Sequence, residues 1–177
     1  MALLDAFNWV QAIGWAAAVV SLLSYQAPGR GMVIALQIVS CLLLVAHYVG
    51  LGTPVGAVFN FLALLRGLAA LWNNRWRRHL VLGFLPLLWG VAIVSHQDWK
   101  DLIPAMAMTF STFAQAAPRI LNLRLYMLAS SPLWFAYAAL CGSQGGMAYE
   151  ILNTLSNGTA IFRYHLLPWF ARRRTAA

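Results

Sequence analysis

The sequence predicts an all-α fold: a polytopic membrane protein whose seven transmembrane helices form two parallel three-helix repeats joined by one linker helix (3+1+3). Of its 177 residues, 62% are hydrophobic and 9% are charged, whereas soluble domains have about 45–50% apolar and about 25% charged residues. The apolar residues form long runs, and seven spans of about 20 residues each would use most of the chain. This composition excludes an ordinary soluble enzyme, a disordered protein and, despite the net charge of +8, a nucleic-acid-binding module.

Proline, glycine and charge clusters divide the chain into seven predicted spans. They are roughly 8–26, 32–50, 54–73, 79–96, 101–117, 121–141 and 146–168. The first run follows Asp5 and has no preceding Lys or Arg. It therefore lacks the basic region of a secretory signal peptide, and we predict a retained span.

The later spans are bounded by short breakers. APGRG separates the first span from the second, and GLGT separates the second from the third; glycine and proline in both segments favour turns. The basic segment NNRWRR precedes the fourth span, and QDWK precedes the fifth, which opens with Asp101 and contains Pro104. PRI and SQG bound the sixth span, and the seventh leads into a basic tail, 169–177.

The basic residues predict how the spans are oriented. If the spans alternate, Lys100 lies on one side and nine arginines lie on the other: Arg30, Arg75, Arg77, Arg78, Arg119, Arg124, Arg172, Arg173 and Arg174. Cytoplasmic loops are enriched in Lys and Arg, which predicts an N-terminus outside and a C-terminus in the cytoplasm. The basic face is expected to contact anionic lipids of the bilayer rather than nucleic acid.

A weak internal repeat relates the two ends of the chain. Aligning SYQAPGR with FAQAAPR pairs Gln26 with Gln115 and places Arg30 opposite Arg119. After one inserted residue, AHYVGLGTPVGAVFN faces AYAALCGSQGGMAYE, which pairs an asparagine of the third span with a glutamate of the seventh. Parallel three-helix repeats occur in known transporters.

We therefore expect a single integral membrane domain over residues 1–177. Repeat 1 would cover about 8–73, the linker helix about 79–96 and repeat 2 about 101–168. The fourth span then serves to bring the chain back across the membrane, so that both repeats run in the same direction.

Three stretches carry a family resemblance: YQAPGR, LQIVSCLLLVAHYVGLGTPVGAVFNFLALLR and YEILNTLSNGTAIFRY. They resemble the bacterial inner-membrane protein family YgjV, which looks related to SWEET sugar facilitators, PQ-loop proteins and nicotinamide-riboside transporters. The resemblance spans nearly the whole chain and implies a 3+1+3 fold with a central polar pathway in the bacterial inner (plasma) membrane. The proline of a Pro-Gln motif is replaced by Tyr25 and Ala114, so sugar transport is not carried over.

Polar side chains on the seventh span predict a solute pathway. Glu150, Asn153 and Asn157 share one helix face, and a charged side chain costs at least about 2.5–3.5 kcal/mol at the membrane centre. The stripe is typical either of the wall of a hydrated pathway or of an interhelical hydrogen-bond seam. The carboxylate favours the pathway, and we predict that Glu150 couples solute movement to protons.

Other spans are expected to add polar groups to the pathway. The predicted contributors are His47, Gln37, Ser40, Asn60 and Tyr137. If His47 converges with Glu150, an imidazole and a carboxylate share a partly buried site where protons can be exchanged. The alternatives are that His47 is an interfacial residue and that Asn60 makes a packing hydrogen bond.

Arg66 lies in the cytoplasmic third of the third predicted span, and Arg163 lies in the cytoplasmic third of the seventh. We expect their side chains to extend to the inner interface or to bind lipid phosphate. In a sharper interpretation, both act with Gln26 and Gln115 as an inner gate or hinge.

No pattern predicts an enzyme, a cofactor or a metal site. The sequence has no glycine-rich phosphate loop and no zinc spacing, and Cys41 and Cys141 are expected to be packing residues at different depths. The leading hypothesis is a transporter or facilitator of a small polar solute. The alternative is a non-transporting membrane protein that binds a partner or lipids; under either hypothesis a homodimer is compatible with the sequence.

Overall fold

The computed structural model describes residues 9–72, 75–95 and 98–169, and the regular structure within them is helical. The helices are α1 (Trp9–Gln26), α2 (Arg30–Gly50), α3 (Pro54–Leu71), α4 (Arg77–Leu82), α5 (Phe84–Val94), α6 (Ile103–Ala116), α7 (Ile120–Leu140) and α8 (Gln144–Ile161). A 3-10 turn, Trp99–Leu102, precedes α6, and a π-helical turn, Phe162–Leu166, follows α8.

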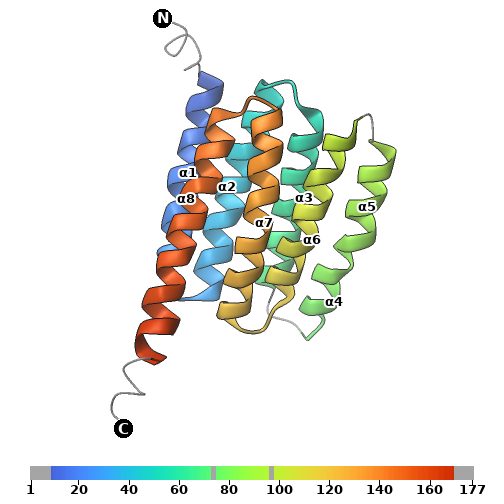
Figure 1. Cartoon of the computed structure of the whole chain (residues 1–177). Helices are drawn as coiled ribbons and strands as arrows, with labels where there is room; N and C mark the ends of the chain where they lie inside the picture. Colours follow the sequence, from blue (N-terminus) through green and yellow to red (C-terminus); the bar gives the residue numbers. More distant parts are fainter. Residues whose placement is uncertain (1–8, 73–74, 96–97, 170–177) are drawn as a thin grey trace, which may run out of the picture.

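These elements form seven helical rods in the described part of the chain, because α4 and α5 meet at Gly83 and continue one another (Figure 1). Their bounds agree with the seven predicted spans to within a few residues. The predicted all-α chain with seven helices is therefore confirmed. Residue 8, the ends predicted at 73 and 96, and residues 170–177 of the basic tail lie outside the described residues.

Turns with special backbone geometry separate the helices. The turns after α2 and α7 each contain a glycine with a positive φ, 68° at Gly52 and 66° at Gly142. A side chain would strain the backbone in that conformation. Pro54 and Pro104 occupy the first turns of α3 and α6, where a missing N–H costs no helical hydrogen bond.

The apolar composition of the helices suits a membrane environment. Three segments are long and apolar enough to span one by length and composition: α2, α3 and the joined segment Arg77–Val94. Among the others, α8 carries polar side chains along its length and α6 has only 14 residues. Large apolar side chains, from Val19 on α1 to Ile151 on α8, are exposed on the outer faces of the helices. Such a surface suits lipid and would promote aggregation in water.

Six of the rods form a closed ring. α1 packs against α2 and α8, α2 against α3, α3 against α6, α6 against α7, and α7 against α8. The α4–α5 rod lies outside this ring beside α3 and α6 (Figure 1). Figure 1 also shows that α1, α3, α6 and α8 run in one direction while α2 and α7 run in the other.

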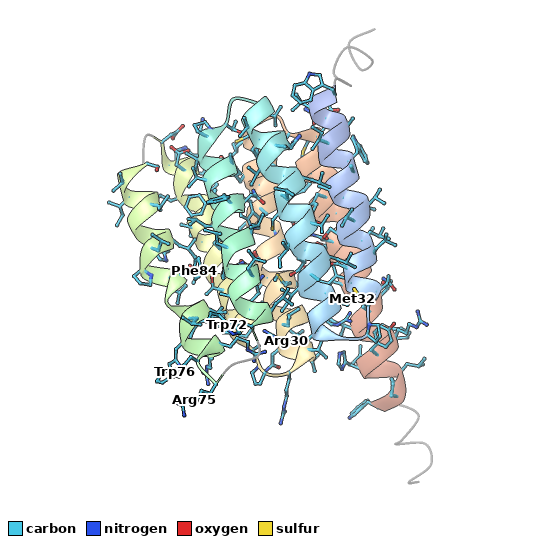
Figure 2. The ribbon with its side chains drawn as sticks, turned by 180° about the vertical axis from the view of Figure 1, so that it is seen from behind. Arg30, Met32, Trp72, Arg75, Trp76 and Phe84 are labelled. Carbon is cyan, nitrogen blue, oxygen red and sulfur yellow. The ribbon has the colours of Figure 1, made fainter. Side chains whose placement is uncertain are left out.

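The two ends of the bundle differ in charge. Figure 2 shows Arg30, Trp72, Arg75 and Trp76 at the end where α1 and α8 finish, which we call the basic end. At the opposite end, Lys100 pairs with Asp98 at 3.5 Å. Tryptophan and arginine side chains gathered at one end of a helical bundle are typical of a membrane interface.

A constant spacing relates the first three rods to the last three. α2 and α7 both have 21 residues, α3 and α8 both have 18, and in each pair the second helix begins 90 residues after the first. Backbone hydrogen bonds in the turns recur at the same interval, from Gly52 N to Val49 O and from Gly142 N to Ala139 O.

One detail of the predicted alignment differs from this spacing. The alignment of the two sequence segments pairs Arg30 with Arg119, 89 residues apart, and then needs one inserted residue. The helices keep a single interval without an insertion, and Arg30 opens α2 where Ile120 opens α7. The pairing of Asn60 with Glu150 follows the same interval.

Candidate functional site

A cavity of about 70 Å³ lies at the centre of the ring, with side chains from all six ring helices in its wall. Its polar lining comprises Tyr25, Gln37, Tyr48, Asn60, Arg66, Ser111, Gln115, Ser130, Ser131, Tyr149, Glu150 and Asn153. Polar groups of this number inside a bundle of membrane helices are costly unless they bind water, each other or a ligand. The cavity is therefore the candidate functional site.

Glu150 provides the carboxylate of the cavity. Its residue is 6% exposed, and its side chain interacts with Ser131 on α7 and with Asn153 one turn further along α8. No ion pair joins Glu150 to a cation among the described residues. The carboxyl group is thus supported by neutral polar groups only, and a cationic ligand group would find no competing cation beside it.

Arg66 provides the cationic group, and here the expectation from the sequence is wrong. Its side chain does not extend to the interface: the residue is 2% exposed and lines the cavity. Its Nε donates to Gln115 Oε1 at 3.1 Å, and its Nη1 donates to Met108 O at 3.0 Å and to Thr112 Oγ1 at 2.5 Å. These α6 acceptors hold the guanidinium inside the ring.

One guanidinium nitrogen of Arg66 remains available. Nε and Nη1 bond to α6, whereas Nη2 donates to no protein group among the described residues. An arginine presents its N–H donors in a planar fork that suits a carboxylate or phosphate. Arg66 can therefore bind an anionic group in the cavity without releasing its contacts with α6.

The polar stripe of α8 divides between two places. Asn153 lines the cavity, and its Oδ1 accepts a hydrogen bond from Ser21 Oγ on α1. Asn157 is 2% exposed and lies outside the cavity lining; its Nδ2 donates to Arg124 O at 2.7 Å. Tyr164 continues the stripe and donates to Gln26 O at 2.9 Å. The stripe lines the cavity at Glu150 and Asn153 and forms a hydrogen-bond seam beyond them.

The second and third rods contribute two of the predicted polar groups to the cavity. Gln37 lines it and donates from Nε2 to the Tyr25 hydroxyl at 3.0 Å, while Gln37 Oε1 has no hydrogen-bond partner in the described part of the chain. Asn60 lines it too, and its Nδ2 donates to Gly56 O at 2.9 Å. Ser40 lies elsewhere, since its hydroxyl faces Ala17 O and Leu36 O.

His47 is completely buried at the end opposite to the basic end, outside the cavity lining. Its Nδ1 lies 2.7 Å from Val10 O, and its Nε2 lies 2.7 Å from Ser143 Oγ. Because a carbonyl oxygen only accepts, Nδ1 carries the proton. The Ser143 hydroxyl then donates to Nε2 while it accepts from Gly146 N. The neutral imidazole is thus fully bonded and joins α1 and α2 to the start of α8.

The predicted convergence of His47 with Glu150 is therefore not what the structure shows. Tyr137 also lies outside the central cavity: its ring packs against Tyr48 and Trp134, with centroid distances of 6.0 Å in both cases. Both residues stabilise the end opposite to the basic end.

The four residues of the predicted inner gate do not form one cluster. Gln115 meets Arg66, as described above, whereas Gln26 Nε2 donates to Ser156 Oγ at 2.8 Å on the other side of the ring. Arg163 is exposed on the π-helical turn and stacks on the Tyr164 ring at 5.3 Å. Only the Arg66–Gln115 contact borders the cavity.

Two other arginines close the basic end. Arg124 is fully buried in α7 and donates to Tyr25 O and Ala27 O, each at 3.0 Å. Arg30 donates to Gln115 O and, at 3.4 Å, to Ala70 O. Arg124 therefore bonds to the end of α1, and Arg30 bonds to the ends of α6 and α3. A buried apolar cluster between them includes Val33, Ile34, Ala114, Leu123 and Met127.

Tyr48, near the end of α2, lies in the cavity wall on the side opposite to the basic end. Its residue is 3% exposed and lines the cavity. A Cβ added to Gly56 would lie 2.8 Å from the Tyr48 ring, and one added to Gly146 would lie 3.0 Å from its hydroxyl. The ring therefore occupies the space that these two glycines leave free. Sequence reasoning did not select Tyr48, and the glycines at equivalent places of the two halves were the available signal.

The comparisons with known proteins give one family. A family model described as a bacterial inner membrane protein, Imp-YgjV, matches residues 8–167. Neither a curated protein nor a solved structure matches the chain. The matched range includes every helix from α1 to the π-helical turn.

Proposed function

The chain belongs to the Imp-YgjV family of bacterial inner membrane proteins, and from that premise we propose that it is a transporter or facilitator of a small polar solute. The observation that carries the proposal is the central cavity with one carboxylate, Glu150, and one guanidinium, Arg66. Ionisable groups inside a membrane bundle mark substrate and ion pathways.

The size of the cavity limits the solute. A buried water molecule needs roughly 10–15 Å³ of such space, and the cavity offers about 70 Å³. A solute of few heavy atoms fits this space, and a larger one requires the ring to widen.

Two parallel repeats, α1–α3 and α6–α8, are part of the proposal. The interval of 90 residues between equivalent helices supports this arrangement, as do the shared helix directions. Transporters built from parallel repeats hold their solute at the interface between the repeats. Here that interface contains the cavity, and the α4–α5 rod outside the ring is the linker.

The proposed mechanism is alternating access. In it, the Arg30 and Arg124 contacts would form the closure at the basic end, and Tyr48 would form the closure at the other. Rocking of one repeat against the other would break one closure while the second persists. We propose that the basic end faces the cytoplasm, because basic residues favour that side.

Uptake into proteoliposomes tests the proposed function. Purified protein is reconstituted, and entry of radiolabelled glycine, β-alanine, acetate, methylammonium and glycerol is compared with protein-free liposomes. We expect saturable uptake of at least one of them. Arg66→Met should abolish it, whereas the matched exposed variant Arg163→Met should retain it.

Absence of protein-dependent uptake for all five solutes, with folded protein in the liposomes, would contradict transport of a small polar solute. The chain would then be a membrane protein that binds a partner or lipids without moving a solute.

A further inference from the structure

We infer that the ligand of the central cavity is a small zwitterion, which places an anionic group on Arg66 and a cationic group against Glu150. This inference rests on the proposed function for its biological meaning, but the binding site itself is argued from the two charged residues and what surrounds them.

The Arg66 guanidinium is prepared for an anion. Two of its three nitrogens are held by Gln115, Met108 and Thr112, so its position is fixed before any ligand arrives. Nη2 donates to no protein group among the described residues, and Arg66 lines the cavity. Preorganised donors bind tightly because little side-chain freedom is lost on binding. A carboxylate of the ligand would accept from Nη2 and offset the buried positive charge.

The Glu150 carboxylate is prepared for a cation. Ser131 and Asn153 interact with it, and in residues 9–72, 75–95 and 98–169 no cation forms an ion pair with it. Asn60, also in the wall, has its Nδ2 engaged with Gly56 O. Its side-chain oxygen is thus free to accept a second hydrogen bond from an ammonium group.

Arg66 and Glu150 do not neutralise each other. Both line the same cavity, yet they lie farther apart than the 4.0 Å of a salt bridge. Two opposite buried charges that are held apart carry a large desolvation cost. One ligand with both charges offsets the cost at both residues, while an anion alone leaves Glu150 unpaired and a cation alone leaves Arg66 unpaired.

Neutral solutes fit the cavity less well. A polyol offers hydroxyl groups that can bond to either residue but leaves both charges uncompensated. The cavity is too small for a sugar without widening. The charge pair therefore selects a short amino acid or a similar dipolar ion.

Binding to purified protein in detergent tests this inference independently of transport. Affinities are measured by titration calorimetry for glycine, β-alanine and 4-aminobutanoate, whose charges are separated by increasing lengths of chain. Acetate, methylammonium and glycerol serve as singly charged and neutral probes. We expect at least one amino acid to bind more than tenfold tighter than each of these three.

Two variants test which residue binds each charged end of the ligand. Glu150→Gln should weaken binding of the best amino acid at least tenfold and leave acetate affinity within twofold. Arg66→Lys should weaken both the amino acid and acetate, because a lysine does not reproduce the guanidinium fork. Arg163→Lys, at an exposed arginine outside the cavity lining, is the control and should leave affinity for the amino acid within twofold.

The inference is overturned if none of the three amino acids binds, if glycerol binds as tightly as the best of them, or if Glu150→Gln keeps wild-type affinity for the amino acid. Uptake of glycerol without binding of amino acids would preserve the proposed transport and exclude the zwitterion. Amino-acid binding without uptake would preserve the zwitterion site and exclude transport.

Discussion

Gly14 on α1 and Gly145 on α8 are in direct backbone contact: a Cβ added to Gly145 would lie 2.7 Å from the Gly14 Cα. The reverse addition at Gly14 would lie 2.9 Å from the Gly145 Cα. The nearby Gln11 side chain reinforces the contact, because its Oε1 accepts from Gly145 N at 3.0 Å. Small residues let membrane helices approach this closely, and the pair fixes the distance between the two halves at the end opposite to the basic end.

Gly145→Ala should therefore destabilise the protein. The added methyl group meets backbone atoms, which cannot move aside as a side chain can, and overpacking of this kind costs about 1–3 kcal/mol. Thermal unfolding in detergent measures the effect. Gly158→Ala on the same helix is the matched control, because nothing lies within 4 Å of its added Cβ. Equal stability of Gly145→Ala and wild type would contradict the close contact.

Glu150→Gln should fold normally but change transport. The amide keeps the size of the side chain and its hydrogen bonds to Ser131 and Asn153, whereas it can neither carry a negative charge nor exchange a proton. We expect at least a tenfold loss of solute uptake, and any remaining uptake should no longer vary with pH. Rates at several pH values in proteoliposomes measure this; wild-type rates with an unchanged pH response would oppose the role of Glu150.

Arg124→Met should lower the stability of the bundle. The variant leaves Tyr25 O and Ala27 O without their donor, and a hydrogen bond to a charged group contributes about 1.5–3 kcal/mol. Thermal unfolding should show a loss of at least that size. Arg163→Met removes an exposed arginine that stacks on Tyr164, and its effect should remain within about 0.5 kcal/mol. Similar losses in the two variants would show that Arg124 does not brace the basic end.

Tyr48→Ala should open the cavity to water-soluble reagents. Cys41 is half-buried and lines the cavity, and the Tyr48 ring fills the space beside Gly56 and Gly146. In a Cys141→Ser background, we expect a membrane-impermeant maleimide to label Cys41 at least tenfold faster in Tyr48→Ala than in the parent. Denatured protein gives the full labelling level. Equal labelling rates would mean that Tyr48 is not the closure.

Reporter fusions should locate both proposed cytoplasmic positions. A reporter fused after Arg78 and another fused after Ala177 are both expected to be active in the cytoplasm, because most basic residues flank the spans on that side. A fusion after Lys100 should report the periplasm. A C-terminal reporter in the periplasm would contradict the proposed orientation.

The seven helices could be predicted because hydrophobic runs and their breakers are local properties of a sequence. Pro54 and Gly142 stand at helix boundaries. Proline and glycine mark such boundaries in the sequence itself. The choice of Glu150 and Asn153 as neighbours in one wall followed from helical periodicity, which holds for any regular helix.

Side-chain reach and tertiary contacts could not be predicted in the same way. On a helical wheel Arg66 lies about 120° from Asn60, yet its long side chain turns towards α6 and reaches the cavity. His47 was expected beside Glu150 because both were placed at similar depth. Its partner is instead Ser143 in the turn before α8, and no local pattern indicates that contact.

Arg124 is another residue whose surroundings could not be predicted from the sequence. The charge count places Arg124 among the arginines on the basic side of the membrane, near the start of a predicted span. It is buried inside α7 and binds the end of α1. Whether an arginine near a helix end faces water or the protein depends on which helix packs beside it, and that information is tertiary.

Each of the two proposed three-helix repeats would cross the membrane an odd number of times. This limits how a chain of two such repeats can arise. A three-helix unit ends on the side of the membrane opposite to its start, so a duplicated copy fused directly to it would insert upside down. Under the proposed repeat, the α4–α5 rod would supply one more crossing, after which the second copy would insert in the same sense as the first. Two identical copies would face each other across a two-fold axis, with the same side chain on both sides of the cavity. Asn60 and Glu150 are 90 residues apart, so the difference between them would make such a symmetric cavity polar in one direction.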